Sequence, residues 1–172
     1  MRLGKHAEAA TLLRTTLAAR TRTLGPDNEF TLNTQSQLTS ALRSLHKYAE
    51  AEALGRVTLE KMQRVLGPGH NNTLNTAGNL AVTLCLRGKY ADAAEIQRGV
   101  LDHTTRLLGA EHKGALITAF NLAMTLSNCG QKTECEQLLR ETLALCRRAL
   151  GPNHAHTQIV LQKMRALGLA AR

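Results

Sequence analysis

The sequence predicts an all-α, right-handed superhelical solenoid built from antiparallel helix pairs. Two observations predict it. Junctions that begin with Leu-Gly recur every 42 residues, at Leu24, Leu66, Leu108 and Leu150. Alanine and leucine supply nearly all of the apolar content, and only 2% of the 172 residues are aromatic. A constant step with small apolar side chains is typical of stacked helical repeats, not of a β-sandwich or a barrel.

A second turn signal divides each repeat into two helices. It recurs with the same step, at Gly4-Lys5-His6, His46-Lys47-Tyr48, Gly88-Lys89-Tyr90 and Gly130-Gln131-Lys132. We expect a single array over residues 1–172, with a half repeat at 4–26, whole repeats at 27–68, 69–110 and 111–152, and a half repeat at 153–172. Because the array would begin and end inside repeats, we expect the chain to be a piece of a longer one.

The repeat at 111–152 shows both helices in order. Apolar residues recur at steps of three and four from Leu116 to Leu126, which predicts a first helix. A longer second helix follows Gly130 and ends at Gly151 and Pro152. The chain opens on a second helix near 5–24 and closes on a first helix near 153–169.

Two kinds of small residue are expected to hold these helices in place. One kind stands near the start of each second helix, where a close crossing leaves no room for a larger side chain: Ala9, Ala51, Ala93 and Cys135. The other consists of threonines in the first turn of the first helices, whose hydroxyls are expected to help satisfy free amide groups: Thr31, Thr73 and Thr157.

The segment from Thr73-Leu74 through Asn79-Leu80-Ala81 to Gly88-Lys89-Tyr90 and Ala93 resembles a tetratricopeptide repeat. The 42-residue period and the junction Leu66-Gly67-Pro68-Gly69-His70 resemble the long repeats of kinesin light chain and nephrocystin-type proteins. This resemblance implies a non-enzymatic scaffold or adaptor. First helices would line a concave groove that binds a peptide segment of a partner.

The resemblance also places candidate binding residues in the groove. The Asn of the Asn-Leu-Ala motif matches Asn79 and Asn121, whose amides can donate to and accept from a peptide backbone at once. Gln37 and Lys163 occupy the same slot in the flanking copies, and Lys163 would favour an acidic group. Helical spacing adds Asn33, Ser40, Arg43, Asn75, Val82, Ile117, Phe120 and Met124. Phe120 and Met124 either anchor an apolar group of the ligand or belong to the core.

Arginines with the same 42-residue step form two ladders on the second helices, within a formal net charge of +9. One ladder is Arg14, Arg56, Arg98 and Arg140, and the other is Arg22, Arg64, Arg106 and Arg148. They are either solvated stems that pair with nearby acids such as Glu52, or a basic surface for an acidic peptide, nucleic acid or another polyanion. Nucleic acid is the weaker choice because aromatic stacking platforms are missing.

Catalytic and metal-binding patterns are absent from the sequence. His70, His112 and His154 share the 42-residue step, which would separate them too far for one metal ion, so we interpret them as turn and helix-start residues. The four cysteines form no Cys-x-x-Cys pair, and no phosphate-binding loop appears. We expect no enzymatic activity, no cofactor and no bound metal.

The expected setting is the cytoplasm. No apolar run approaches the roughly 20 residues that span a bilayer, so we expect no membrane insertion. Partners are expected to be proteins or peptides of acidic character. The apolar stretch at 167–171 suggests self-association through an exposed solenoid end.

Overall fold

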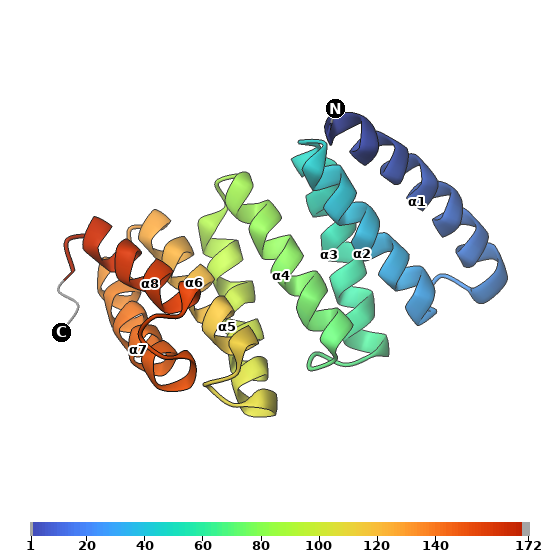
Figure 1. Cartoon of the computed structure of the whole chain (residues 1–172). Coiled ribbons are helices and arrows are strands. Elements are labelled where there is room, and N and C mark those ends of the chain that lie inside the picture. The colour runs from blue at the N-terminus through green and yellow to red at the C-terminus, as the bar shows by residue number, and fades with distance from the viewer. Residues whose placement is uncertain (1, 170–172) are drawn as a thin grey trace. The chain divides into compact units, whose positions relative to one another are not determined.

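The computed structural model describes residues 2–169, and these form two compact units, Met1–Lys89 and Tyr90–Arg172. In unit 1 the described helices are α1 (Arg2–Leu24), α2 (Glu29–Ser44), α3 (Tyr48–Val65) and α4 (Asn71–Leu86). In unit 2 they are α5 (Tyr90–Leu108), α6 (Lys113–Asn128), α7 (Lys132–Leu150) and α8 (Ala155–Ala166). Within each unit, consecutive helices lie side by side and run in opposite directions (Figure 1). No strand occurs among residues 2–169, which confirms the all-α fold of paired helices.

The core of unit 1 includes the small residue predicted at the start of α3. Ala51 is fully buried, together with Leu38, Leu42 and Ala10. In α1 the prediction is off by one residue, because Ala9 is exposed and Ala10 is buried. The partly buried Leu13 and Leu17 follow Ala10 at helical spacing on the face that packs against the core, so Ala9 lies on the solvent side.

In unit 2, leucines of α6 and α7 meet Val160 and Met164 of α8 in one cluster. Cys135, at the predicted close crossing, is 3% exposed. The α8 helix is shorter than the predicted 153–169 and ends at Ala166. Leu167 is 43% exposed, while the end of the apolar stretch, Ala170 and Ala171, lies outside the described residues.

The Leu-Gly junctions share one backbone conformation. Gly25, Gly67, Gly109 and Gly151 have φ between 88° and 92°, a left-handed conformation that favours glycine. Three residues after each glycine, a side chain caps the next helix by accepting a backbone N–H bond. The caps are Asn28 Oδ1 at 2.9 Å and the Nδ1 atoms of His70, His112 and His154 at 3.3, 3.1 and 3.1 Å. The interpretation of these histidines as helix-start residues is confirmed.

The threonines of the first turns do not bond the free amides, so that prediction is wrong. Thr73 Oγ1 donates to the carbonyl of Met62 at 3.4 Å, and Thr157 Oγ1 donates to the carbonyl of Gly151 at 2.8 Å. Thr31 Oγ1 is buried without a hydrogen bond among the described residues. Because Asn28 and the histidines already cap the amides, the hydroxyls of Thr73 and Thr157 bond carbonyls at the end of the preceding helix or in the junction instead.

Candidate functional site

The first helices of unit 1, α2 and α4, are joined by polar contacts along their length. Asn72 Nδ2 donates to Glu29 Oε1 at 2.7 Å, and the hydroxyls of Ser36 and Thr76 lie 2.8 Å apart. These side chains come from positions that the helical period places on facing surfaces of the two helices. The polar face of α2 and α4 is therefore held together by hydrogen bonds as well as by the apolar core.

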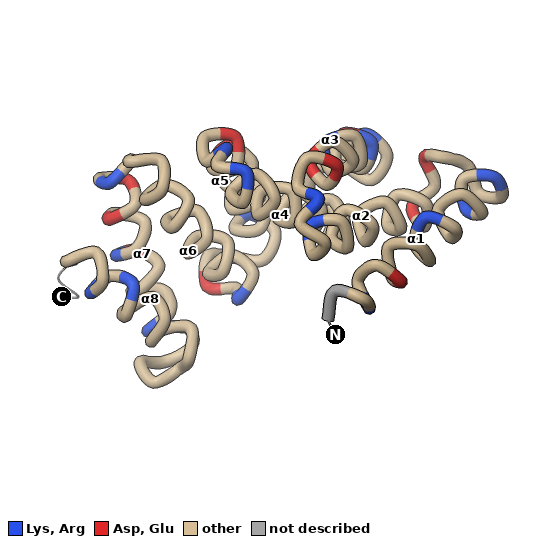
Figure 2. The backbone as a smooth tube through the Cα atoms, turned by 90° about the horizontal axis from the view of Figure 1, so that it is seen from above, with Lys and Arg blue, Asp and Glu red and all other residues tan. Residues whose placement is uncertain are grey.

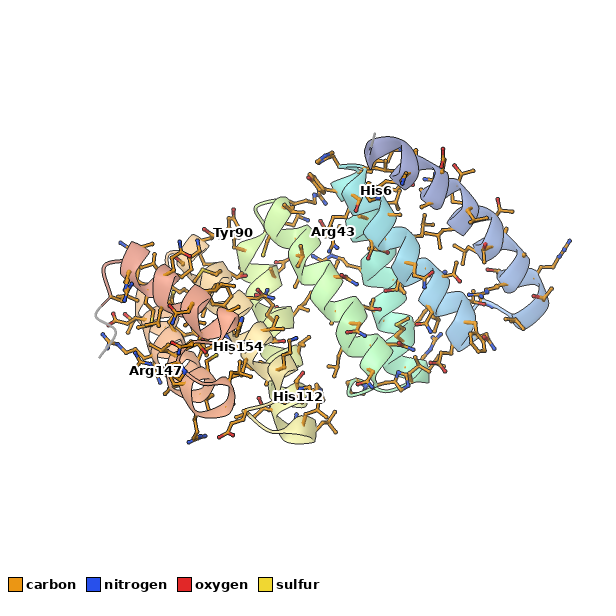
Figure 3. All side chains as sticks on the ribbon, viewed as in Figure 1. His6, Arg43, Tyr90, His112, Arg147 and His154 are labelled. Carbon is orange, nitrogen blue, oxygen red and sulfur yellow. The ribbon has the colours of Figure 1, made fainter. Side chains whose placement is uncertain are left out.

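Arg43 makes the third contact between these helices. Its Nη1 donates to the backbone carbonyl of Asn79 at 3.2 Å and to Asn79 Oδ1 at 3.4 Å, and Figure 3 shows Arg43 on α2 beside α4. Burial lowers the pKa of Arg43 from its ordinary value. Two residues that the sequence assigns to the groove are thus in direct contact. The Asn79 side-chain oxygen is engaged by Arg43, while its NH₂ group has no partner among the described residues.

The remaining candidate residues of unit 1 present free polar groups. Gln37 and Asn75 are exposed, and Asn33 and Ser40 are half-buried. Their side chains make no hydrogen bond to another residue within the described part of the chain. Val82 lies on the same helix as Asn75 and is 40% exposed. This face therefore offers unpaired amides around a fixed guanidinium.

The first helices of unit 2 carry a more apolar face. Phe120 and Met124 are half-buried and pack against the core cluster, so they are partly core and partly accessible. The Phe120 ring meets the His156 ring of α8 edge-on, with centroids 5.8 Å apart. Beside them Ile117, Asn121 and Lys163 are exposed.

The first arginine ladder connects consecutive second helices. Arg14 of α1 bonds Glu50 of α3 at 2.7 Å, and Arg98 of α5 bonds Glu134 of α7 at 2.8 Å. Arg56 and Arg140 instead pair within their own helices, with Glu52 at 3.0 Å and Glu136 at 2.6 Å. All four guanidinium groups therefore face a carboxylate.

Two arginines of the second ladder bond an acid in the junction that begins their own repeat. Arg64 bonds Asp27 at 2.8 Å, Arg148 bonds Glu111, and Arg106 bonds Asp102 within α5. A hydrogen bond from Lys61 holds the pKa of Asp27 below its ordinary value, with Arg64 adding to the effect. Arg22 alone among the eight has no ion pair with a described residue. The interpretation as solvated stems paired with acids accounts for the other seven.

Glu52 is the centre of a charge cluster, and the arginine ladders predicted only its contact with Arg56. It is 5% exposed and accepts from Lys89 at 2.8 Å, from Arg56 at 3.0 Å and from Arg87. Burial alone would raise the pKa of Glu52, but the three hydrogen bonds outweigh it and lower the pKa to about 2. Sequence spacing finds Arg56, four residues away, but not Arg87 and Lys89, which reach Glu52 from the end of α4.

Chemistry-bearing groups form no reactive constellation in the part of the chain that is described. Cys135 and Cys146 are buried, and burial raises the pKa of both thiols. No three histidine, cysteine or acidic side chains gather as a metal site within residues 2–169. No described helix is long and apolar enough to cross a membrane.

Comparison with known proteins decides the family. A model of the tetratricopeptide repeat matches residues 1–63 and 72–130, which is more than half of the chain. The chain belongs to the tetratricopeptide repeat family. A second tetratricopeptide repeat model matches residues 118–156. Membership of this family supports a protein-interaction scaffold.

Solved structures with the same fold include relatives of kinesin light chain. Two are crystal structures of a Podosopora anserina putative kinesin light chain with nearly identical TPR-like repeats, at 24% identity and TM-scores of 0.88 and 0.87. Each alignment covers 96% of this chain and 80% of that one. A third is BtubC (BKLC) from P. vanneervenii, at 18% identity and a TM-score of 0.69, covering 96% of this chain and 63% of that one.

At these identities the likeness shows the fold alone, a helical solenoid of the kinesin light chain type. A search of the curated proteins finds no significant match to the chain.

Proposed function

We propose that this tetratricopeptide repeat chain is an adaptor whose first-helix faces bind an extended peptide segment of a partner protein. The observation that carries the proposal is the set of amides left without partners beside the fixed guanidinium of Arg43. Asn33, Gln37 and Asn75 have no hydrogen bond to other described side chains, although each can both donate and accept. Such groups satisfy the polar backbone of an extended peptide without requiring a particular side chain.

The two units contribute different chemistry to this recognition. On unit 1, Arg43 is a half-buried cation at the edge of the amide face, so it favours an acidic residue of the peptide. On unit 2, Phe120 and Met124 supply an apolar surface beside Asn121, and Lys163 adds a second cation. The segment that unit 1 prefers is therefore acidic, and the segment that unit 2 prefers carries an apolar anchor. The four free cysteines favour a reducing compartment such as the cytoplasm.

Substitution of the two motif asparagines tests the proposal. Peptides selected from a displayed peptide library on the purified chain would be labelled, and their affinity measured by fluorescence anisotropy. Asn79→Ala with Asn121→Ala should weaken binding by about tenfold or more while the thermal melt changes little, because Arg43 keeps its bond to the Asn79 backbone carbonyl. The matched control is Asn71→Ala with Asn128→Ala, which removes exposed asparagines at the ends of the same two helices. Equal affinities for both double variants would refute the proposal.

A further inference from the structure

A cleft of about 350 Å³ lies between α5 and α7 of unit 2. Its apolar lining consists of Leu101, Leu122 and Leu138, of which Leu122 is 3% exposed and the other two are half-buried. The volume falls within the range of roughly 300–1,000 Å³ that is usual for ligand sites. A leucine or methionine side chain seated here would bury apolar surface of its own and of the cleft.

The rim of this cleft is acidic, although the chain as a whole is strongly basic. Three carboxylates, Asp102, Glu134 and Glu141, face one lining cation, Arg98. Arg98 is already paired with Glu134 at 2.8 Å. Figure 2 marks the acidic and basic positions of α5 and α7 in red and blue. The lining therefore has more negative than positive groups in a chain whose formal net charge is +9.

The other two rim carboxylates are accessible to a ligand. Asp102 is paired with Arg106, one turn further along α5, and its side chain is 60% exposed. Glu141 accepts a hydrogen bond from Gln137 Nε2 at 3.0 Å and has no cation partner among the described residues. Exposed ion pairs are weak, so a cationic ligand can compete for Asp102 and can bind Glu141 directly.

A comparison with the equivalent positions of unit 1 separates the rim groups that recur from those that do not. Two repeats earlier, 84 residues along the sequence, the pair Arg98–Glu134 corresponds to Arg14–Glu50, which is also bonded, at 2.7 Å. The other rim residues Asp102, Gln137 and Glu141 correspond to Ala18, Ala53 and Val57. The bonded pair thus recurs in both units, but no carboxylate stands at the positions of α1 and α3 that lie 84 residues before Asp102 and Glu141. Packing of the helices does not require them.

We propose that the α5–α7 cleft binds a basic amphipathic segment of a partner protein. An apolar side chain of the segment sits between Leu101 and Leu138, and flanking lysines or arginines meet Asp102 and Glu141. The net positive charge of the chain repels such a segment elsewhere and steers it to this acidic rim. This site goes beyond the proposed peptide adaptor, because it uses none of the candidate groove residues and selects the opposite charge.

Synthetic peptides of defined charge test this site. One labelled helical peptide carries leucines on one face and lysines on the other, and a second carries glutamate in place of every lysine. Fluorescence anisotropy with the full chain should show binding of the lysine peptide at this cleft, whereas the glutamate peptide should bind only through the first-helix faces and should not respond to changes at the rim. Asp102→Asn with Glu141→Gln should weaken this binding by about tenfold. Glu8→Gln with Glu60→Gln is the matched control, because it makes the same charge change at exposed sites of α1 and α3.

Three outcomes would overturn the proposal. Undiminished affinity of the Asp102→Asn, Glu141→Gln variant would show that the rim carboxylates do not bind the lysine peptide. An equal loss in the matched control would show that only the overall charge matters. Equal binding of a lysine peptide with alanine in place of leucine would show that no leucine of the peptide binds in the apolar part of the cleft. Asn79→Ala with Asn121→Ala should leave the lysine peptide's affinity unchanged, which separates this cleft from the peptide-binding faces.

Discussion

Arg43 of α2 donates to both the backbone carbonyl and the side-chain oxygen of Asn79 of α4, at 3.2 and 3.4 Å. The two residues are 36 positions apart, the same separation as in the bonded pairs Arg14–Glu50 and Arg98–Glu134. An arginine that reaches the equivalent helix of the next repeat is thus a recurring contact of this chain. On the first helices it ends on an asparagine, and on the second helices it ends on a glutamate.

Arg43→Ala should destabilise unit 1 by about 1–2 kcal/mol, because the charge-assisted bonds from Arg43 to the Asn79 carbonyl and to Asn79 Oδ1 are lost, while the carbonyl keeps only its bond from Thr83 Oγ1 among side chains. Urea denaturation followed by circular dichroism measures the change. Arg147→Ala removes an exposed arginine of α7 and should leave the free energy of unfolding nearly unchanged. Equal stability of the two variants would mean that the Arg43–Asn79 contact contributes nothing in solution.

Glu52→Gln should destabilise the fold by about 1–3 kcal/mol at neutral pH, because Lys89, Arg56 and Arg87 lose their shared carboxylate. Glu60→Gln on the same helix is the control, since Glu60 is exposed. Its unfolding free energy should match that of the unsubstituted chain.

The effect of Glu52→Gln should depend on pH in a defined direction. The pKa of Glu52 is about 2 in the folded chain, against an ordinary value of 4.5. A lowered folded-state pKa means that the stabilisation is complete above about pH 4.5 and is lost as the pH falls toward 2. The unfolding free energies of the original chain and the variant should therefore converge on acidification. A gap that stays constant down to about pH 2.5 would contradict the assigned cluster.

Ala51→Leu should destabilise unit 1 by about 1–3 kcal/mol, because Ala51 is fully buried where α3 starts and a larger side chain would overpack that crossing. Thermal melts by circular dichroism measure the loss. Ala53→Leu places the same side chain at an exposed position two residues later and should change the melting temperature little. A melt of Ala51→Leu that matches Ala53→Leu would place the close crossing elsewhere.

His112→Ala should cost about 0.5–2 kcal/mol, because Nδ1 of His112 caps α6 by accepting from the Gly114 amide. His112→Asn should retain the stability, since Asn28 already makes the equivalent bond at the start of α2. Differential scanning calorimetry of both variants distinguishes the cap from simple loss of the ring. Equal destabilisation by Ala and Asn would show that packing of the imidazole matters more than its hydrogen bond.

Much of the local structure could be predicted because its causes lie within a few residues. The glycines of the junctions need a left-handed backbone, and residues three positions later can cap a helix without help from the rest of the chain. The hydrogen bonds of the first-turn threonine hydroxyls could not be predicted in this way, because their partners lie outside the threonines' own helices. Thr73 bonds the carbonyl of Met62 and not an amide of its own helix, because the end of α3 brings that carbonyl within reach.

The candidate site was predictable as a list of residues but not as a set of contacts. Helical spacing found both Arg43 and Asn79, yet it could not show that one bonds the other. Spacing also revealed two arginine ladders but left open whether they are a binding surface or structural stems. The structure adds that Arg14 bonds Glu50 and Arg98 bonds Glu134, which spacing within one helix could not show.

By itself the sequence determined the 42-residue period, the helix pairs and the tetratricopeptide repeat pattern, because periodicity and turn chemistry act along the chain. Only the tertiary structure decided which charges are neutralised, which amides stay free and where α5 and α7 leave an acidic cleft over Leu122. The physical reason is distance along the chain. Partners 36 or 37 residues apart meet only after the helices of each unit stack, and the stacking sets which side of each helix a side chain can reach.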